Sequence, residues 1–505
     1  MRIVLFNTTG MISCDGARLI SALLKRAGHS VKNVLLTRNE NIPYQASDLA
    51  CLSETLKECD FAMFAVYSKR AAISAQITEF IHTKHLGIKV IWGGPHCIAA
   101  PETSLRYADG VCFAEGDVAV VELVNSVERG SDYENTPNMA FKVNGNYKKN
   151  KVLPPLHDMD SLPYYDYDLN DYFVFDDKLS PVTWETSKRY FSKYPFGEPT
   201  CTILTSRGCP FACSYCTNAR HIGMYGHIPM RFMSVKRIID ELEYTIRRFS
   251  FIKDVAFADD DFLVRDKKQL DDFARQYKER IGLPFGFCIS APTFRREKME
   301  ILLDTGLLRM VEMGVQSGSQ RVLDEVFQRK IKVSKTKEVL SLLTPYFDKY
   351  RFNVLLDFII DNPYETKDDI IQTYKYIIAV PRFVKIRAFL LAFFPGSPIY
   401  DRAVKDGIVV ESPLENMKRF CGTRWVLSYQ NNYETLLIWL AVFLANHPSL
   451  RRRFPTPVLR MIASRPVRKV ASLIPKKGCI VLQLLCSFFI SRVLKVFRLI
   501  YRVVR

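Results

Sequence analysis

The sequence predicts two consecutive α/β domains followed by a helical, basic C-terminal region. Short apolar, β-rich runs alternate with helical patterns twice along the chain, first before residue 130 and again after residue 200. With 505 residues and 48% hydrophobic composition, the chain is too long for one ordinary core and too apolar for disorder. We therefore divide it into a first domain at 1–130, a connector at 131–199, a second domain at 200–408 and a C-terminal region at 409–505.

The first domain has the pattern of a parallel, doubly wound (Rossmann-like) sheet of five strand–helix units. Such a sheet binds ligands beside the carboxyl ends of its strands. The connector loses this rhythm and becomes rich in Asp, Tyr and Pro, so we expect a segment that wraps between the domains. In the first domain, strands are expected near 3–6, 60–66, 89–92 and 110–113, and helices near 16–27, 71–84 and 118–127.

The second domain repeats the strand–helix alternation six times. This number of units predicts a partial (β/α)6, TIM-like barrel, in which reactive groups lie at the carboxyl ends of the strands. The expected strands lie near 202–205, 254–258, 285–289, 308–313, 352–360 and 385–392.

The net charge of +18 is concentrated at the C-terminal end. Of the 71 Lys and Arg residues, 14 lie between 451 and 505, where no Asp or Glu occurs, which leaves 57 basic and 53 acidic residues elsewhere. The body of the chain is thus close to neutral, and we expect no nucleic-acid partner. The 13 cysteines are scattered and no signal peptide is visible, which favours a reducing cytoplasm.

The C-terminal region contains apolar blocks at 435–445 and 478–491, both shorter than the roughly 18 residues needed to span a bilayer. Residues 492–505 place a basic side chain at every third or fourth position between apolar ones, the pattern of a basic amphipathic helix. This tail favours peripheral docking on the inner face of a membrane. Nucleic-acid binding and packing on the barrel with one solvated face remain as alternatives.

Three cysteines follow the first strand of the second domain with the spacing C-x3-C-x2-C, at Cys209, Cys213 and Cys216. Soft sulfur ligands favour iron–sulfur or zinc, and three protein ligands leave one metal position open for an exogenous ligand. A structural zinc site completed by His221 is the alternative.

This loop resembles the signature of the radical S-adenosylmethionine (SAM) superfamily, in which three cysteines hold a 4Fe-4S cluster whose open iron chelates SAM. The resemblance gives Tyr215 the aromatic place in the loop. It also implies that Asp259 or Asp260, after the second strand, holds the SAM amino group, although an acidic run there also suits a helix N-cap.

The segment 313–319 looks like the superfamily's Gly-Val-Glu-Ser stretch, which approaches the ribose and methionine parts of SAM. Gln316 and Ser317 take the polar positions. Gln316 replaces the usual Glu, so a hydrogen-bonding group is kept but its charge is lost.

In the first domain, Gly93-Gly94-Pro95-His96 follows the strand expected near 89–92, Glu102 comes shortly after it, and Glu115-Gly116 follows the strand expected near 110–113. These segments make the first domain similar to the cobalamin-binding domain of class B radical SAM enzymes. The Asp-x-His-x-x-Gly sequence that supplies a cobalt-ligating histidine in classical cobalamin domains is absent, so His96 is not offered as a cobalt ligand. The residues that carry the resemblance, and that it assigns to cobalamin binding, are Gly93, Gly94, Pro95, His96, Glu102, Glu115 and Gly116.

The resemblance implies an enzyme that cleaves SAM reductively to methionine and a 5′-deoxyadenosyl radical, and that uses cobalamin to methylate an unactivated carbon. It assigns no catalytic proton donor or acceptor. We expect a small-molecule substrate, in our interpretation a lipid or isoprenoid, and an electron donor such as flavodoxin or ferredoxin. The alternatives are cyclisation or rearrangement of a carbon skeleton without methyl transfer, a non-catalytic cobalamin-binding regulator, and a methylthiotransferase, which would want further clustered cysteines upstream.

Overall fold

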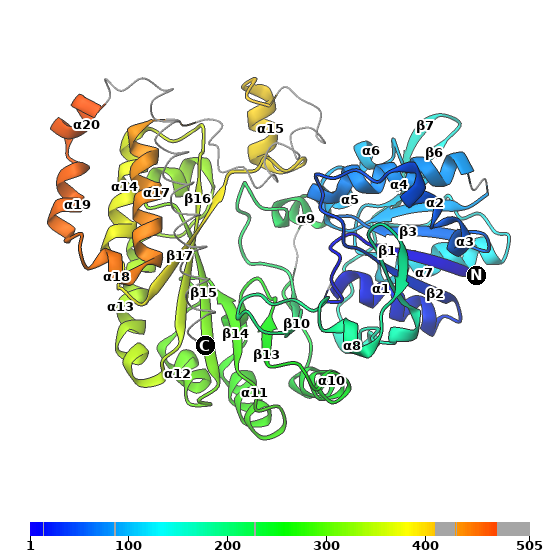
Figure 1. Ribbon diagram of the computed structural model, residues 1–505, viewed down its shortest axis with the longest axis horizontal. Helices are drawn as coiled ribbons and strands as arrows, with labels where there is room; N and C mark the ends of the chain where they lie inside the picture. The colour runs from blue at the N-terminus through cyan, green and yellow to red at the C-terminus, as the bar shows by residue number, and fades with distance from the viewer. Residues whose placement is uncertain (14, 85–86, 227–228, 410–429, 431, 472–505) are drawn as a thin grey trace. The chain divides into compact units, whose positions relative to one another are not determined.

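The computed structural model describes the whole chain except residues 14, 85–86, 227–228, 410–429, 431 and 472–505 (Figure 1). The chain forms two compact units. The first comprises residues 1–289, 295–309 and 392–421, and the second comprises residues 290–294, 310–391 and 422–505. Each unit is described by itself.

The N-terminal sheet has the predicted doubly wound core of five parallel strands. The strand order β5-β4-β3-β1-β2 reverses direction between β3 and β1. That reversal is the position where open α/β sheets bind ligands at their carboxyl edge. The five strands are β1 (Arg2–Asn7), β2 (Ser30–Leu36), β3 (Phe61–Ala65), β4 (Lys89–Gly93) and β5 (Gly110–Cys112).

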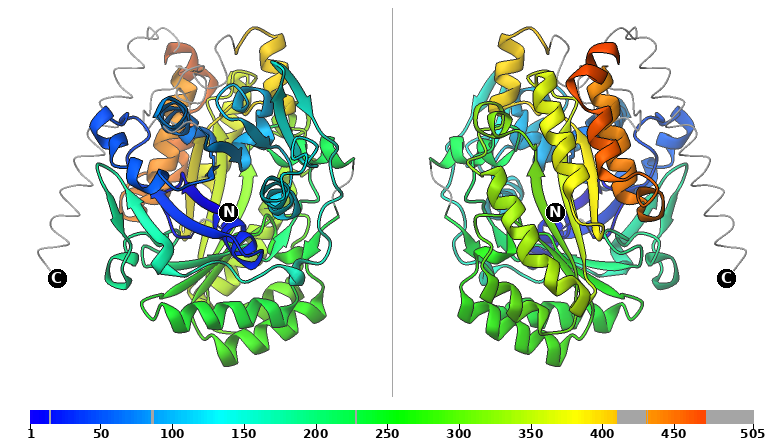
Figure 2. Two further views of the ribbon diagram at one scale, coloured as in Figure 1. Left: turned by 90° about the vertical axis from the view of Figure 1, so that its right-hand side faces the viewer. Right: turned by 90° about the vertical axis from the view of Figure 1, so that its left-hand side faces the viewer.

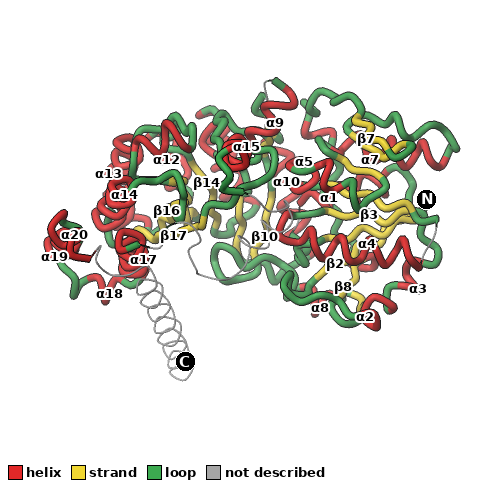
Figure 3. Tube along the Cα trace, turned by 90° about the horizontal axis from the view of Figure 1, so that it is seen from above, coloured by secondary structure: helices red, strands yellow, loops and turns green. Residues whose placement is uncertain are grey.

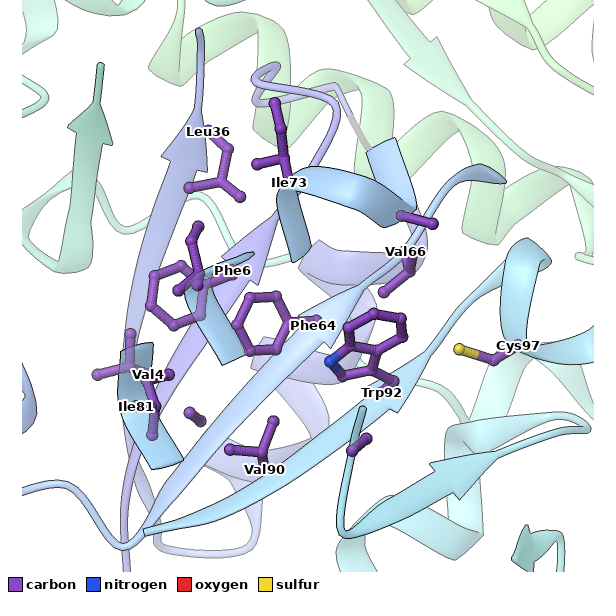
Figure 4. Close-up of a cluster of buried hydrophobic side chains, with 14 of the residues drawn as sticks. Val4, Phe6, Leu36, Phe64, Val66, Ile73, Ile81, Val90, Trp92 and Cys97 are labelled. Carbon is purple, nitrogen blue, oxygen red and sulfur yellow. The ribbon is translucent and has the colours of Figure 1, made fainter. Parts of the chain in front are cut away.

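Side-chain alternation along β1 builds a separate core on each face of this sheet. Val4 and Phe6 belong to the core cluster that includes residues of α4 (Ala71–Lys84), and the Phe6 and Phe64 rings stack at 4.5 Å (Figure 4). Ile3 and Leu5 belong to the opposite cluster. That cluster is covered by α1 (Asp15–Arg26) and α7 (Gly116–Glu128), so helices flank the strands on both sides (Figure 3).

The predicted connector is partly a continuation of this sheet rather than only a wrap between domains. Four of its segments extend the sheet to nine strands, in the order β7-β6-β5-β4-β3-β1-β2-β8-β9. These edge strands are three to five residues long, too short to produce a readable alternation. They are β6 (Met139–Val143), β7 (Asn146–Lys149), β8 (Tyr172–Phe175) and β9 (Leu179–Pro181).

The six predicted barrel strands are all present, in the order β10-β13-β14-β15-β16-β17, and the pairs within each unit are parallel. The partial (β/α)6 barrel is therefore confirmed. The strands are β10 (Thr200–Ile203), β13 (Asp254–Phe257), β14 (Phe285–Ile289), β15 (Leu308–Gln316), β16 (Asn353–Ile360) and β17 (Val384–Leu390). The helices between and after them are α10 (Val235–Arg248), α11 (Lys267–Arg280), α12 (Arg296–Leu303), α13 (Val333–Tyr350), α14 (Lys367–Ala379) and α15 (Pro398–Lys405).

A small antiparallel ribbon lies between β10 and α10. It consists of β11 (Ser206–Arg207) and β12 (Arg231–Phe232), and the segment between these strands contains α9 (Asn218–Tyr225). The remaining short helices are α2 (Ala46–Ala50), α3 (Ser53–Leu56), α5 (Pro95–Ala99), α6 (Pro101–Ser104) and α8 (Trp184–Ser187).

The C-terminal region begins with α17 (Tyr433–Asn446), the first predicted apolar block, which packs on α14 and β17 (Figure 2). Short helices α18 (Pro448–Arg451), α19 (Thr456–Ile462) and α20 (Arg465–Ala471) follow. The expected apolar block at 478–491 and the basic helix at 492–505 lie outside the described residues. None of the helices that the structure describes is long and apolar enough to cross a membrane.

Candidate active site

The three cysteines lie on the loop between β11 and α9. Cys213 is buried at 4% exposure, and Cys209 and Cys216 are half-buried. Desolvation raises the pKa of the Cys209 thiol to about 12, with further contributions from the negative charges of Asp260, Cys216 and Cys213. These mutual effects show that the loop gathers the three sulfurs and one carboxylate in the same neighbourhood.

The chemistry of this donor set fits an iron–sulfur cluster, whose ligands are thiolates. Among the described cysteines none forms a disulfide, so no covalent pairing competes for the three sulfurs. In the part of the chain that the structure describes, no three His, Cys, Asp or Glu side chains are arranged to hold a metal ion. The donor set, and not a preformed cage, therefore carries the cluster assignment.

The two neighbouring carboxylates after β13 have different surroundings. Asp259 is buried, and its oxygens accept hydrogen bonds from the Thr205 and Ser206 amides at 2.6 and 2.9 Å and from the Thr205 hydroxyl at 2.7 Å. Asp260 is exposed and accepts a hydrogen bond from Asn218 at 2.9 Å. Asp259 thus stabilises the backbone that leads into the cysteine loop by accepting its hydrogen bonds. The Asp260 carboxylate lies beside the loop and is exposed to solvent.

Gln316 ends β15 and Ser317 follows it, both in the second unit. Gln316 is half-buried and has a φ of 69°, in the left-handed region. A Cβ on Gly314 would lie 2.5 Å from the Gln316 side-chain nitrogen, so this amide occupies the space that the glycine leaves open. Ser317 is fully buried, and its hydroxyl lies 3.2 Å from the Thr373 hydroxyl.

Two further loop residues were singled out by the sequence. Tyr215 is half-buried between Cys213 and Cys216. The ring of His221, the residue that would complete a zinc site, lies 6.3 Å from the Tyr225 ring on the same helix, and desolvation lowers the pKa of His221.

The carboxyl edge of the N-terminal sheet exposes two large side chains and contains a tight glycine turn. Met11 and Tyr67, which follow β1 and β3 on either side of the strand-order reversal, are 41% and 38% exposed. Gly93 ends β4, and Gly94 has a φ of 97° and a missing Cβ that would lie 3.0 Å from the Val66 amide nitrogen. Gly94 is therefore required by the tight turn into α5, and this turn shapes the edge.

The structure turns His96 into the domain interior. Pro95 begins α5, and the His96 side chain is fully buried with its Nδ1 3.2 Å from the Ser68 hydroxyl. Desolvation lowers the pKa of His96 to about 4, so the ring is neutral at pH 7. His96 supports the turn from inside the domain.

The other candidates after β4 and β5 differ in their contacts. Glu102 is exposed in the first turn of α6. Gly116 packs closely, because a Cβ there would lie 3.3 Å from the Val120 side chain. The Glu115 carboxylate accepts hydrogen bonds from both terminal nitrogens of Arg231, at 2.9 and 2.6 Å.

The sequence patterns missed the arginines that meet this edge. Asp117 accepts hydrogen bonds from Arg207 at 2.5 and 3.0 Å, and Arg207 and Arg231 face each other across the β11–β12 ribbon. The partners lie about a hundred residues apart in the sequence, so no local motif could have found them.

Comparison with known families identifies both domains. The Radical SAM superfamily model covers residues 203–377, which include the cysteine loop, and the B12 binding domain model covers residues 1–124. The chain belongs to the cobalamin-dependent radical SAM enzymes. Its cofactors are accordingly a 4Fe-4S cluster, SAM and cobalamin.

Relatives of this radical SAM enzyme include methyltransferases and a cyclase. An uncharacterized methyltransferase from Pyrococcus horikoshii is 27% identical over 69% of this chain and 68% of its own length. The anaerobic magnesium-protoporphyrin IX monomethyl ester cyclase of Cereibacter sphaeroides is 24% identical over 70% of this chain but only 54% of its own length. The structure of TsrM, a radical SAM methyltransferase from Kitasatospora setae, shares the fold, with a TM-score of 0.63, 15% identity and coverage of 81% and 77% of the two chains.

Proposed function

We propose that this radical SAM enzyme methylates an unactivated carbon with the help of cobalamin. The observation that carries the proposal is that the cysteine loop is bordered by two arginines bound to the N-terminus of α7 in the B12-binding domain. Such a contact suits a reaction in which both cofactors act on one substrate. When bound, the cofactors supply reductive SAM cleavage, hydrogen abstraction and methyl delivery.

The roles of individual residues follow from their surroundings. Cys209, Cys213 and Cys216 hold the cluster, and Tyr215 packs beside it. Asp260 is proposed to accept the SAM amino group, since the Asp259 carboxylate is already occupied by protein donors. Gln316 is proposed to meet the remaining polar parts of SAM, whereas Ser317, which is fully buried with its hydroxyl 3.2 Å from the Thr373 hydroxyl, is proposed to support the end of β15 from inside.

Cobalamin is proposed to lie along the edge formed by Gly93, Gly94 and Pro95, with Met11 and Tyr67 offering apolar surface to the corrin ring. Glu102 and Gly116 are retained as candidates for polar or close backbone contact. His96 does not reach the ligand directly in this proposal, because its side chain is fully buried.

A lipid or isoprenoid substrate and a peripheral contact with the inner face of the membrane are part of the proposal. Helices α19 and α20 and the turn before α19 expose apolar side chains among basic ones. Phe454 in that turn, Val458 and Met461 on α19, and Val470 on α20 are between 40% and 69% exposed. No acidic residue occurs from 451 to the end of the chain. Cationic surfaces that also expose apolar groups bind anionic lipid. The exposed basic residues are Arg452, Arg453, Arg460, Arg465 and Lys469.

Sedimentation with phosphatidylglycerol and phosphatidylcholine vesicles tests the membrane contact. We expect binding to the anionic vesicles only, weakened by salt, by the double change Arg460→Glu and Lys469→Glu, and by removal of residues after Lys477. Arg247→Glu, at an exposed position on α10, serves as the control for a lost charge. Equal binding by all forms would reject the contact.

Cyclisation or rearrangement of a carbon skeleton is the second candidate, because a cyclase is among the relatives. Reconstituted enzyme is incubated with reductant, isoprenoid-rich lipid extract and SAM carrying a deuterated methyl group. Label in an extract lipid supports methylation. A new unlabelled product with an altered skeleton supports the second candidate, and label confined to water-soluble products rejects the lipid assignment. Flavodoxin or ferredoxin is the proposed electron donor, and the cytoplasm the proposed compartment.

A further inference from the structure

Both strands that border the cysteine loop carry an arginine directed at the same helix terminus. Arg207 on β11 and Arg231 on β12 are paired in register, and the loop with all three cysteines lies between them in the sequence. Their partners, Asp117 and Glu115, lie in the first turn and at the N-cap of α7. We call these four residues the arginine clamp.

Each pair of the clamp is bidentate. Arg207 donates to the two Asp117 oxygens at 2.5 and 3.0 Å, and Arg231 donates to the two Glu115 oxygens at 2.9 and 2.6 Å. A third contact, Arg207 to Glu115 at 3.6 Å, links the two pairs. Bidentate arginine–carboxylate pairs fix orientation as well as distance, because the two planar groups must lie side by side.

The clamp is buried enough for its charges to interact strongly. The exposed fractions of its four side chains lie between 4% and 16%. Burial alone would raise the pKa of Glu115, but the hydrogen bonds of Arg231 and the charges of both arginines lower it instead. Burial would likewise lower the pKa of Arg207, and Asp117 raises it. The Glu115 carboxylate is therefore ionised at neutral pH.

Stabilisation of α7 alone does not account for this arrangement. Acidic groups at a helix N-terminus are favourable even when solvent surrounds them. Here the same terminus also contacts the end of α9, the helix that follows the cysteine loop, since the Glu115 amide donates to the Tyr225 hydroxyl at 3.3 Å. Met224 and Tyr225 pack against the core of the B12-binding domain. The contacts thus hold the loop at both ends.

We propose that the arginine clamp is a positioning device that fixes the cluster loop against the B12-binding domain and so sets the separation of SAM from the corrinoid. The inference rests on the proposed use of cobalamin. None of the four residues touches a reacting atom in this account. They act by positioning the loop. A displacement of the reacting groups by about 1 Å lowers the reaction rate up to about a hundredfold.

The test compares wild type with Asp117→Asn and Arg207→Lys, each of which removes one element of the bidentate pair with little change in size. Asp48→Asn is the matched control. It breaks the similarly buried pair of Asp48 with Arg38, which lies wholly within the N-terminal domain. Asp117→Glu keeps the carboxylate and serves as the conservative rescue.

Two substrate-free products of the reconstituted enzyme report the effect. Methyl transfer from SAM to reduced corrinoid releases S-adenosylhomocysteine and needs both cofactors at the correct separation. Reductive cleavage of SAM releases 5′-deoxyadenosine and needs only the cluster. We expect the ratio of the first product to the second to fall about tenfold or more in Asp117→Asn and Arg207→Lys, and to be kept in Asp48→Asn and Asp117→Glu. An unchanged ratio, or an equal fall in Asp48→Asn, overturns the proposal.

Hydrogen exchange on the protein without cofactors separates failure of the clamp from failure of the proposed function. We expect faster amide exchange at residues 206–207, 218–226 and 231–232 in Asp117→Asn than in Asp48→Asn, with the rest of the first unit unchanged. Unchanged exchange at these amides overturns the clamp whether or not cobalamin binds. If these amides exchange faster in Asp117→Asn than in wild type but wild type binds no corrinoid, the proposed function is rejected, and with it the clamp's role in methyl transfer.

Discussion

The Arg265 guanidinium lies 2.8 Å from the Asp259 carboxylate, and both side chains are almost completely shielded from solvent. Arg265 also donates to the Thr205 hydroxyl at 2.6 Å. This buried pair joins the end of β13 to the residues that lead into the cysteine loop. The neighbouring carboxylate of Asp260 faces outward beside that loop.

Substitution should therefore separate the two aspartates. Asp259→Asn leaves a buried guanidinium without its counter-ion, so we expect a loss of about 3 kcal/mol in stability, measured as a lower unfolding midpoint. Asp260→Asn should leave the midpoint unchanged and weaken SAM binding by about tenfold, measured by equilibrium dialysis on the cluster-loaded enzyme. The reverse pattern would assign SAM to Asp259.

Cys213→Ala should abolish cluster binding, because the three sulfurs come from one loop and no other described cysteine lies on it. The matched control is Cys201→Ala, which removes another buried thiol, on β10. Iron analysis after reconstitution and 5′-deoxyadenosine formation measure the result. Retention of iron and SAM cleavage in Cys213→Ala would show that the cluster ligands lie elsewhere.

Gly314→Ala tests the role of Gln316. The added methyl group would lie 2.5 Å from the present position of the Gln316 nitrogen, so this flexible amide must move while the fold is kept. If Gln316 binds SAM, the affinity should fall about tenfold. Gly16→Ala, which meets nothing within 4 Å, is the control. Unaltered SAM affinity in Gly314→Ala would remove Gln316 from the binding site.

His96 should make stability depend on pH. Its folded-state pKa of about 4 lies below the ordinary value of 6.5, so its contribution is complete above pH 6.5 and is lost as the pH falls toward 4. The loss approaches about 3 kcal/mol. Unfolding midpoints between pH 7.5 and 4.5 should fall less steeply for His96→Gln than for wild type. Parallel curves would contradict the burial of a neutral ring.

The sequence predicted the elements whose residues are buried on both sides. All six barrel strands and the named strands of the N-terminal sheet were found, because buried parallel strands are continuous apolar runs of four residues or more. The strands β6 to β9 at the two ends of the sheet were read as a connector, since each is only three to five residues long. In these edge segments the pairing partner, and not the local pattern, decides the structure.

The candidate site was predictable to the extent that its residues are close in sequence. The cysteine triplet could be identified from the sequence alone. The different roles of Asp259 and Asp260 could not, because adjacent carboxylates differ only in the partners that the fold gives them. Glu115 was assigned to the cofactor, and its pairing with Arg231 came from the tertiary fold alone. Long-range ion pairs of this kind leave no periodic signal in the sequence.

Anaerobic reconstitution with iron, sulfide and hydroxocobalamin tests the central claim most directly. The enzyme is then analysed for iron and corrinoid and assayed for SAM cleavage under reductant. The account predicts about four iron atoms per chain, bound corrinoid, and formation of both 5′-deoxyadenosine and S-adenosylhomocysteine. Zinc in place of iron, with neither corrinoid nor any SAM cleavage, would contradict it.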